Sequence, residues 1–316
     1  MKKLVSILAV LALLLSICAV AGAEGATYQV GILQFVQHPA LDEATRGFRE
    51  ALTEKLGNSV VFTEENASGE VPNCATIASQ LVAKQVNLIM ANATPPLQAC
   101  TNATGDIPVL GTSVTDYQSA LEIELVNDAT GINVSGTSDL APLDRQAEMI
   151  RELFPEAKTV GLLYCSGEAN SIFQIKKVEE YLTAMGIECK RFAFTDSNDL
   201  ASVTQTATEC DVIYIPTDNT AANNTEAIAN IVIPAKVPVI AGEEGICKGC
   251  GIATLSISYY DIGRKTGEMA YEILVNGADV STMPIAYAPQ VVKEYNAANA
   301  AELGVVIPEG YLPIGE

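Results

Sequence analysis

Small polar side chains gather in this sequence where apolar, strand-like segments end. The stretch YIPTDNTAANN, residues 214–224, passes from a β-branched run to one aspartate among uncharged hydrogen-bonding groups. Free N–H groups at helix N-termini attract anions, and a carboxylate holds a cation such as an ammonium group. Donors beside acceptors therefore suit a zwitterion. Five more segments have this character: residues 34–38, 93–96, 113–116, 165–171 and 242–245.

Each of these residues also has a purely structural interpretation. Asp218 fits an Asx-turn, and Phe35, which ends an apolar strand, fits a core as well as a ligand surface. His38 is the only histidine, and a lone imidazole before a proline fits a polar loop as well as a site. Ser, Thr and Asn favour helix N-caps, which is the alternative for Thr94, Ser113 and Asn170.

Motifs for catalysis are absent from the sequence. It contains no GxSxG elbow, no P-loop and no GxGxxG, and no cluster has the spacing of metal ligands. A Ser–His–Asp arrangement would have to recruit His38. We therefore expect a binding protein with no catalytic residue, no metal and no cofactor.

The first residues have the form of a secretory signal peptide. Lys2 and Lys3 precede an apolar run that is short for a membrane span, and Ala21-Gly22-Ala23 supplies a small-x-small cleavage site. We predict a signal peptide at residues 1–23 and an extracytoplasmic protein. A retained anchor and a lipid attached to Cys18 are the alternatives, and Ile17 before that cysteine disfavours the lipid.

Charge and length limit the class of protein further. After cleavage 16 basic and 38 acidic residues remain, a formal charge of −22. Such a surface repels nucleic acid and anionic lipid. About 290 residues exceed what one core serves, so two lobes are expected.

Seven cysteines remain after cleavage, in a compartment that permits disulfides. Cys247 and Cys250 form a CxxC before the strand-like IATLSIS, which favours a local disulfide in a stapled hairpin or loop, with free thiols as the alternative. Weaker candidate pairs are Cys74 with Cys100 and Cys189 with Cys210.

The order of elements indicates a repeated α/β plan. YQVGILQFV (28–36) and KTVGLLYC (158–165) each open a half, and each precedes an amphipathic helix that ends in glycine. DIPVLGT (106–112) matches KVPVIAG (236–242), and a further pair of strands lies about twenty residues before these two. The pattern predicts two doubly wound parallel-sheet lobes of similar topology.

The C-terminal segments predict a hinge of three crossings. The first crossing is expected around residues 138–144, and a chain that returns to the first lobe and crosses again accounts for the rest. We predict a first lobe of residues 27–140 plus 260–285 and a second of 141–259 plus 286–316. Such hinges suit closure around a ligand.

Eight phrases in order resemble the ABC-transporter substrate-binding proteins of the tryptophan/tyrosine-type group. The match spans nearly all of residues 28–310. The phrases are LQFVQHPALD (33–42), ATPP (93–96), SVTD (113–116), SDLAP (138–142), LYCSGEANS (163–171), IPTDNT (215–220), AGEEG (241–245) and YYDIGRKTGEMA (259–270).

The resemblance implies a type I periplasmic-binding-protein fold that holds a free amino acid or similar small molecule between its lobes. It implies Asn170 and Ser171 near a ligand carboxylate and Asp218 near an ammonium group. By position, the ligand contacts would be Phe35, His38, Thr94, Thr115 and Asp116 in the first lobe, and Glu168, Asn170, Ser171, Asp218, Asn219 and Glu244 in the second.

The leading hypothesis is a non-enzymatic, monomeric receptor that delivers a small solute to the membrane permease of an ABC importer. The solute is expected to be an amino acid, with an aromatic one as the narrower hypothesis, and no nucleic acid is expected as partner. One alternative is a ligand-sensing module for a membrane receptor. Another is a secreted enzyme on the same scaffold with Glu168 or Asp218 as base.

Overall fold

The computed structural model describes residues 27–288 and 290–315. The predicted signal peptide at residues 1–23 and Cys18 lie outside the described residues. Within the described ranges, no helix is long and apolar enough to cross a membrane.

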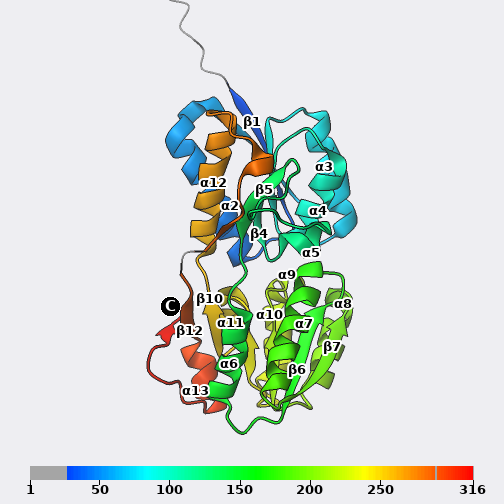
Figure 1. The fold of residues 1–316 in the computed structure, drawn as a ribbon. Helices are drawn as coiled ribbons and strands as arrows, with labels where there is room; N and C mark the ends of the chain where they lie inside the picture. Colours follow the sequence, from blue (N-terminus) through cyan, green and yellow to red (C-terminus); the bar gives the residue numbers. More distant parts are fainter. Residues whose placement is uncertain (1–26, 289, 316) are drawn as a thin grey trace, which may run out of the picture.

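The first lobe is built on a six-stranded parallel sheet (Figure 1). Its strand order is β11-β5-β4-β3-β1-β2. The strands are β1 (Tyr28–Gln34), β2 (Val60–Asn66), β3 (Leu88–Asn92), β4 (Val109–Val114), β5 (Val134–Ser138) and β11 (Ala286–Tyr287). The helices around it are α2 (Pro39–Leu56), α3 (Val71–Ala83), α4 (Thr94–Ala103), α5 (Tyr117–Leu121) and α12 (Tyr259–Leu274).

The second lobe repeats this plan on a seven-stranded sheet of order β13-β12-β10-β9-β8-β6-β7, in which β12 runs antiparallel to β10. The strands are β6 (Thr159–Cys165), β7 (Glu188–Phe194), β8 (Val212–Ile215), β9 (Val239–Ala241), β10 (Ala253–Ser256), β12 (Val292–Tyr295) and β13 (Leu312–Pro313). The helices are α6 (Leu143–Leu153), α7 (Ala169–Ala184), α8 (Ser197–Ala207), α9 (Asn219–Ala222), α10 (Thr225–Val232), α11 (Glu244–Gly249) and α13 (Ala297–Leu303).

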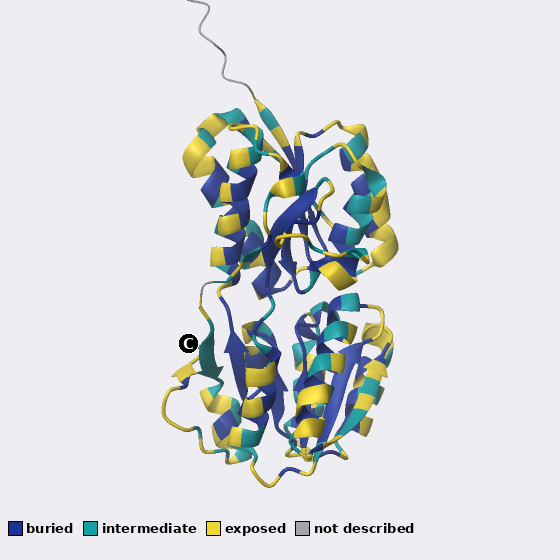
Figure 2. Cartoon of the chain, in the orientation of Figure 1, coloured by how far each residue is buried: buried dark blue, intermediate teal, exposed yellow. Residues whose placement is uncertain are grey.

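The central strands are buried because helices cover both faces of each sheet (Figure 2). Every residue of β3, β4 and β5 is buried, including the small polar side chains of β5. On one face of the first sheet, α2 and α12 pack very closely. A Cβ built at Gly263 would lie 2.1 Å from the Ala44 carbonyl oxygen, so glycine permits this approach.

The predicted fold class is confirmed. β4 and β9 occupy equivalent positions in the two sheets, as do β3 and β8, which agrees with the paired phrases of the sequence. The chain passes between the lobes after β5, after β10 and after β11, which gives the three crossings of the hinge.

Two local expectations differ from the structure. Ala286 pairs with Thr137 of β5, so the predicted boundary at 285/286 lies two residues too early, because the apolar segment 285–295 forms one strand in each lobe. The CxxC lies at the end of the short helix α11 instead of in a hairpin.

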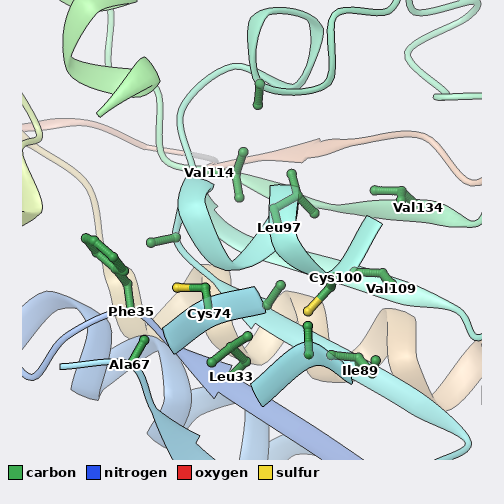
Figure 3. Close-up of a cluster of buried hydrophobic side chains, with 14 of the residues drawn as sticks. Leu33, Phe35, Ala67, Cys74, Ile89, Leu97, Cys100, Val109, Val114 and Val134 are labelled. Atoms are coloured by element: carbon green, nitrogen blue, oxygen red, sulfur yellow. The ribbon is translucent and has the colours of Figure 1, made fainter. Parts of the chain in front are cut away.

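All seven cysteines of the described residues are free thiols. Cys74 and Cys100 share one core cluster (Figure 3). Cys189 lies beside Val160 in the sheet and packs on one core cluster, whereas Cys210 lies against Gly161 on the opposite face, so the predicted pairing of these two has the wrong geometry.

Candidate functional site

The carboxyl ends of both sheets meet between the lobes. In Figure 1, α4 and α5 of the first lobe lie over α7 and α9 of the second. A small cavity of about 10 Å³ lies there, about the space of one water molecule, so an amino acid enters only when the lobes move apart. Its lining residues come from both lobes and the hinge: His38, Leu41, Ser113, Thr115, Asp139, Asn170, Thr217, Asp218, Asn219, Ala222, Glu243 and Tyr259.

Two side-chain contacts join the lobes across this cavity. His38 Nε2 lies 3.2 Å from Asn219 Oδ1, and Thr115 Oγ1 lies 3.4 Å from Thr217 Oγ1. Burial lowers the pKa of His38, which favours the neutral imidazole. A neutral imidazole with a proton on Nε2 would donate to the asparagine oxygen. The two lobes are therefore held in a closed arrangement.

Asp218 begins helix α9 and faces the cavity. Its carboxylate accepts hydrogen bonds from Cys165 N at 2.6 Å, Ser171 Oγ at 2.8 Å and Ala221 N at 2.9 Å. Burial, and next the negative charge of Glu168, raise its pKa. Asp218 thus combines a helix-capping role with a place in the predicted cleft.

Glu168 is buried behind the cavity lining and orients α9. Its Oε1 accepts from Thr220 N at 2.9 Å and Thr220 Oγ1 at 2.8 Å, and its Oε2 accepts from Asn219 N at 3.0 Å and Asn219 Nδ2 at 2.7 Å. These bonds occupy both oxygens. The structure therefore gives Glu168 a positioning role, through Asn219, in place of the expected direct contact.

Asn170 and Ser171 lie in the first turn of helix α7, but their side-chain donors are already used. Asn170 Nδ2 donates to the Thr217 carbonyl oxygen at 2.9 Å, and Ser171 Oγ donates to Asp218. Asn170 lines the cavity, whereas Ser171 lies behind it. The two side-chain donors expected to bind a ligand carboxylate are therefore engaged within the second lobe.

Four buried polar atoms around the cleft have no hydrogen-bond partner among the described residues. Ser113 Oγ, His38 Nδ1 and Asn170 Oδ1 belong to cavity-lining residues, and Thr94 Oγ1 lies at the start of α4, beside the end of β4. Buried polar groups are normally paired. These atoms are therefore the available hydrogen-bonding groups of the site.

Besides Thr94, Glu168 and Ser171, three more predicted residues lie outside the cavity lining. Phe35 packs in the core of the first lobe, because it points to the same face of the sheet as Leu33 (Figure 3). Asp116 caps α5 by accepting from Ser119 N at 2.7 Å. Glu244 is exposed, and Glu243 faces the cavity in its place.

Sequence reasoning missed several lining residues, of which the acids matter most. Asp139 directly follows β5 and accepts from Thr115 Oγ1 at 3.0 Å and from the Tyr259 hydroxyl at 3.0 Å. Glu243 caps α11 through the amides of Gly245 and Ile246. Both follow strands, so the strand-end rule would have found them had it been applied to the hinge and to each residue of the turn.

The sequence as a whole was then compared with known proteins. The model of the family described as ABC transporter substrate binding protein matches residues 29–314. The chain belongs to this family. Its members bind small solutes, and the predicted recognition is confirmed.

Two relatives of this chain have a name or a structure that identifies an aromatic amino acid as their ligand. A tyrosine-binding protein of Clostridioides difficile is 35% identical over 260 residues, which cover 81% of this chain and 75% of the relative. An ABC domain from Streptococcus pneumoniae in complex with L-Trp is 32% identical, with a TM-score of 0.87 over 91% of this chain and all of that one.

A ligand-free, open substrate-binding protein of Clostridium difficile is 35% identical, but its TM-score is only 0.69, over 91% of this chain and 99% of that one. The L-Trp complex is thus more similar in shape although its sequence is slightly less similar. This difference agrees with the closed arrangement of the lobes seen here.

Proposed function

We propose that this protein is the extracytoplasmic receptor of an ABC importer, which captures a free aromatic amino acid between its lobes and delivers it to a membrane permease. It acts as a monomer and carries out no catalysis. The family and the two relatives that are named for, or contain, tyrosine or L-Trp support this proposal.

The observation that carries the proposal is the division of polar groups across the cleft. The second lobe presents the carboxylates of Asp218 and Glu243, and the hinge presents that of Asp139, which suit an ammonium group. The first lobe presents the unpaired hydroxyl of Ser113 at the cavity, with the unpaired hydroxyl of Thr94 buried at the start of α4, and such hydroxyls suit a carboxylate. A zwitterion bridging the lobes would pair both sets.

This orientation revises the predicted role of one helix. Asn170 and Ser171 were expected near the ligand carboxylate, but their side-chain donors bind Thr217 and Asp218. We place the ligand carboxylate at the first lobe and the ammonium group at the second. The Tyr259 ring, Leu41 and Ala222 then offer apolar contact to the rest of the ligand.

Closure supplies the link between binding and delivery. A 10 Å³ cavity cannot admit an amino acid while the lobes are closed. The ligand therefore binds an open form and stabilises a closed one, in which His38 meets Asn219. The closed form is the state that a permease would have to recognise.

Titration calorimetry of residues 24–316 with L-tyrosine and L-tryptophan tests the proposal. The matched control ligand is 3-(4-hydroxyphenyl)propionate, which keeps the ring and the carboxylate of tyrosine but lacks the ammonium group. We expect binding of at least one amino acid and a loss of at least tenfold for the control. Equal affinity for both, or no binding of either amino acid, would contradict the proposal.

A further inference from the structure

Three carboxylates face the closed cavity, and no lysine or arginine lines it. Asp139, Asp218 and Glu243 are 4%, 1% and 3% exposed, so water contributes little to their solvation. An isolated ion in such surroundings is costly, and like charges add repulsion. An aromatic amino acid brings one positive and one negative charge and so leaves the total charge of the site unchanged.

The hydrogen bonds of these acids differ in number and kind. Asp218 accepts from two backbone amides and one hydroxyl, and Glu243 accepts from two backbone amides of its own helix. Asp139 accepts only from the hydroxyls of Thr115 and Tyr259. Burial outweighs these bonds in each case and raises the pKa of all three carboxyls, that of Glu243 to about 7.

The neighbouring titratable groups do not supply the missing positive charge. His38 faces the site from the start of α2, and burial lowers its pKa, so it stays neutral. Glu168 behind Asp218 and Glu244 beside Glu243 add negative charge. Lys248 and Glu294 line a neighbouring pocket with Glu243 but do not line this cavity. Other titratable groups around the three acids are neutral in their protonated form: Tyr117 of α5, Tyr259 of α12, Cys165 of β6, and Cys247 and Cys250 of α11.

We propose that closure of the cleft around its ligand, whose ammonium group pairs with the Asp218 carboxylate, is coupled to the uptake of protons by Asp139 and Glu243. The protons come from the solvent and neutralise carboxylates that are hydrated when the lobes are apart. The inference rests on the proposed function, because it concerns the ligand-driven closure of the same site.

The direction of the pH dependence follows from linkage. A carboxyl whose pKa is higher in the closed form stabilises that form, and this contribution is complete when the pH is below the open-form pKa. That contribution is lost as the pH rises through the closed-form value. For Glu243 the affinity therefore changes with pH between the ordinary carboxyl pKa of 4.5 and the closed-form pKa of about 7. One such group makes the ligand bind about tenfold more tightly at pH 6 than at pH 8, and a second group increases the ratio further.

Calorimetry in buffers of different ionisation enthalpy measures the protons directly. Titration of residues 24–316 with L-tyrosine or L-tryptophan at pH 7, in phosphate and in Tris, gives the number taken up for each ligand bound. We expect an uptake of about half a proton or more. The same titrations at pH 6 and pH 8 should show the tenfold change in affinity.

Glu243→Gln removes one proton acceptor and should lower the uptake at pH 7 by about half a proton. The control is Glu226→Gln, an exposed acid at the start of α10 in the same lobe, which should leave the uptake unchanged. The wild-type measurement decides the matter even if the first variant fails to fold.

The outcomes separate this inference from the proposed function. Ligand binding with no proton exchange, or with proton release, overturns the inference and leaves the proposed function standing. A pH-independent affinity between pH 6 and pH 8 also overturns the inference alone. Absence of binding by every aromatic amino acid overturns both.

Discussion

Glu168→Gln is expected to destabilise the second lobe and to weaken ligand binding. The carboxylate joins the start of α7 to the start of α9 through Asn219 and Thr220. Glutamine keeps one acceptor oxygen but replaces the other with an NH₂ group, which cannot accept from the two N–H or O–H donors that bind that oxygen in the wild type. At least two hydrogen bonds to a charged acceptor are lost, each worth about 1.5 kcal/mol or more, so the free energy of unfolding should fall by about 3 kcal/mol.

Urea unfolding followed by circular dichroism measures this loss, with each lobe allowed its own transition. The control is Glu180→Gln on the same helix, where the exposed side chain pairs with Lys177 at 3.3 Å and should change stability by less than about 0.5 kcal/mol. A loss below about 1 kcal/mol for Glu168→Gln would refute the positioning role. So would an unchanged ligand affinity, because Asn219 would then need no support.

Three further substitutions test other parts of the structure. Gly263→Ala should destabilise the first lobe by about 1–3 kcal/mol, because its Cβ would meet the backbone of α2, whereas Gly105→Ala, which meets nothing within 4 Å, should change little on denaturation. His38→Ala should raise the Kd for the amino acid about fivefold in calorimetry, since its bond to Asn219 forms only in the closed state. Thr94→Val should raise the thermal midpoint of the free protein by removing an unpaired buried hydroxyl, yet weaken binding; tighter binding would show that this hydroxyl faces no ligand.

The fold was predictable because its signals are local and repeated. Continuous apolar runs marked the strands of both sheets, and the matching phrases around residues 106–112 and 236–242 marked the same strand position twice. Strand direction then indicated where Asp218, Thr115 and His38 would meet, because the carboxyl ends of parallel strands lie at one edge. The partition of residues 285–295 between two sheets depends on tertiary pairing, and no local pattern reveals it.

The wrong predictions at the site concern which of two adjacent residues faces the cavity, or whether a side chain lines the cavity or lies behind it. Glu243 and Glu244 are equivalent in sequence, and only the start of α11 decides which carboxylate caps the helix inside the cleft. Glu168 is in the predicted place, but the donors of α9 occupy it completely. Phe35 ends its strand at the cleft, yet the alternation of side chains turns it into the core.

A crystal structure of residues 24–316 grown with L-tyrosine or L-tryptophan tests the central claim most directly. The account predicts one amino acid between closed lobes, with its ammonium group within hydrogen-bonding distance of Asp218 or Glu243 and its carboxylate near Ser113 and Thr94. An amino acid bound outside the cleft, or bound with its carboxylate against Asn170 and Ser171, would contradict it.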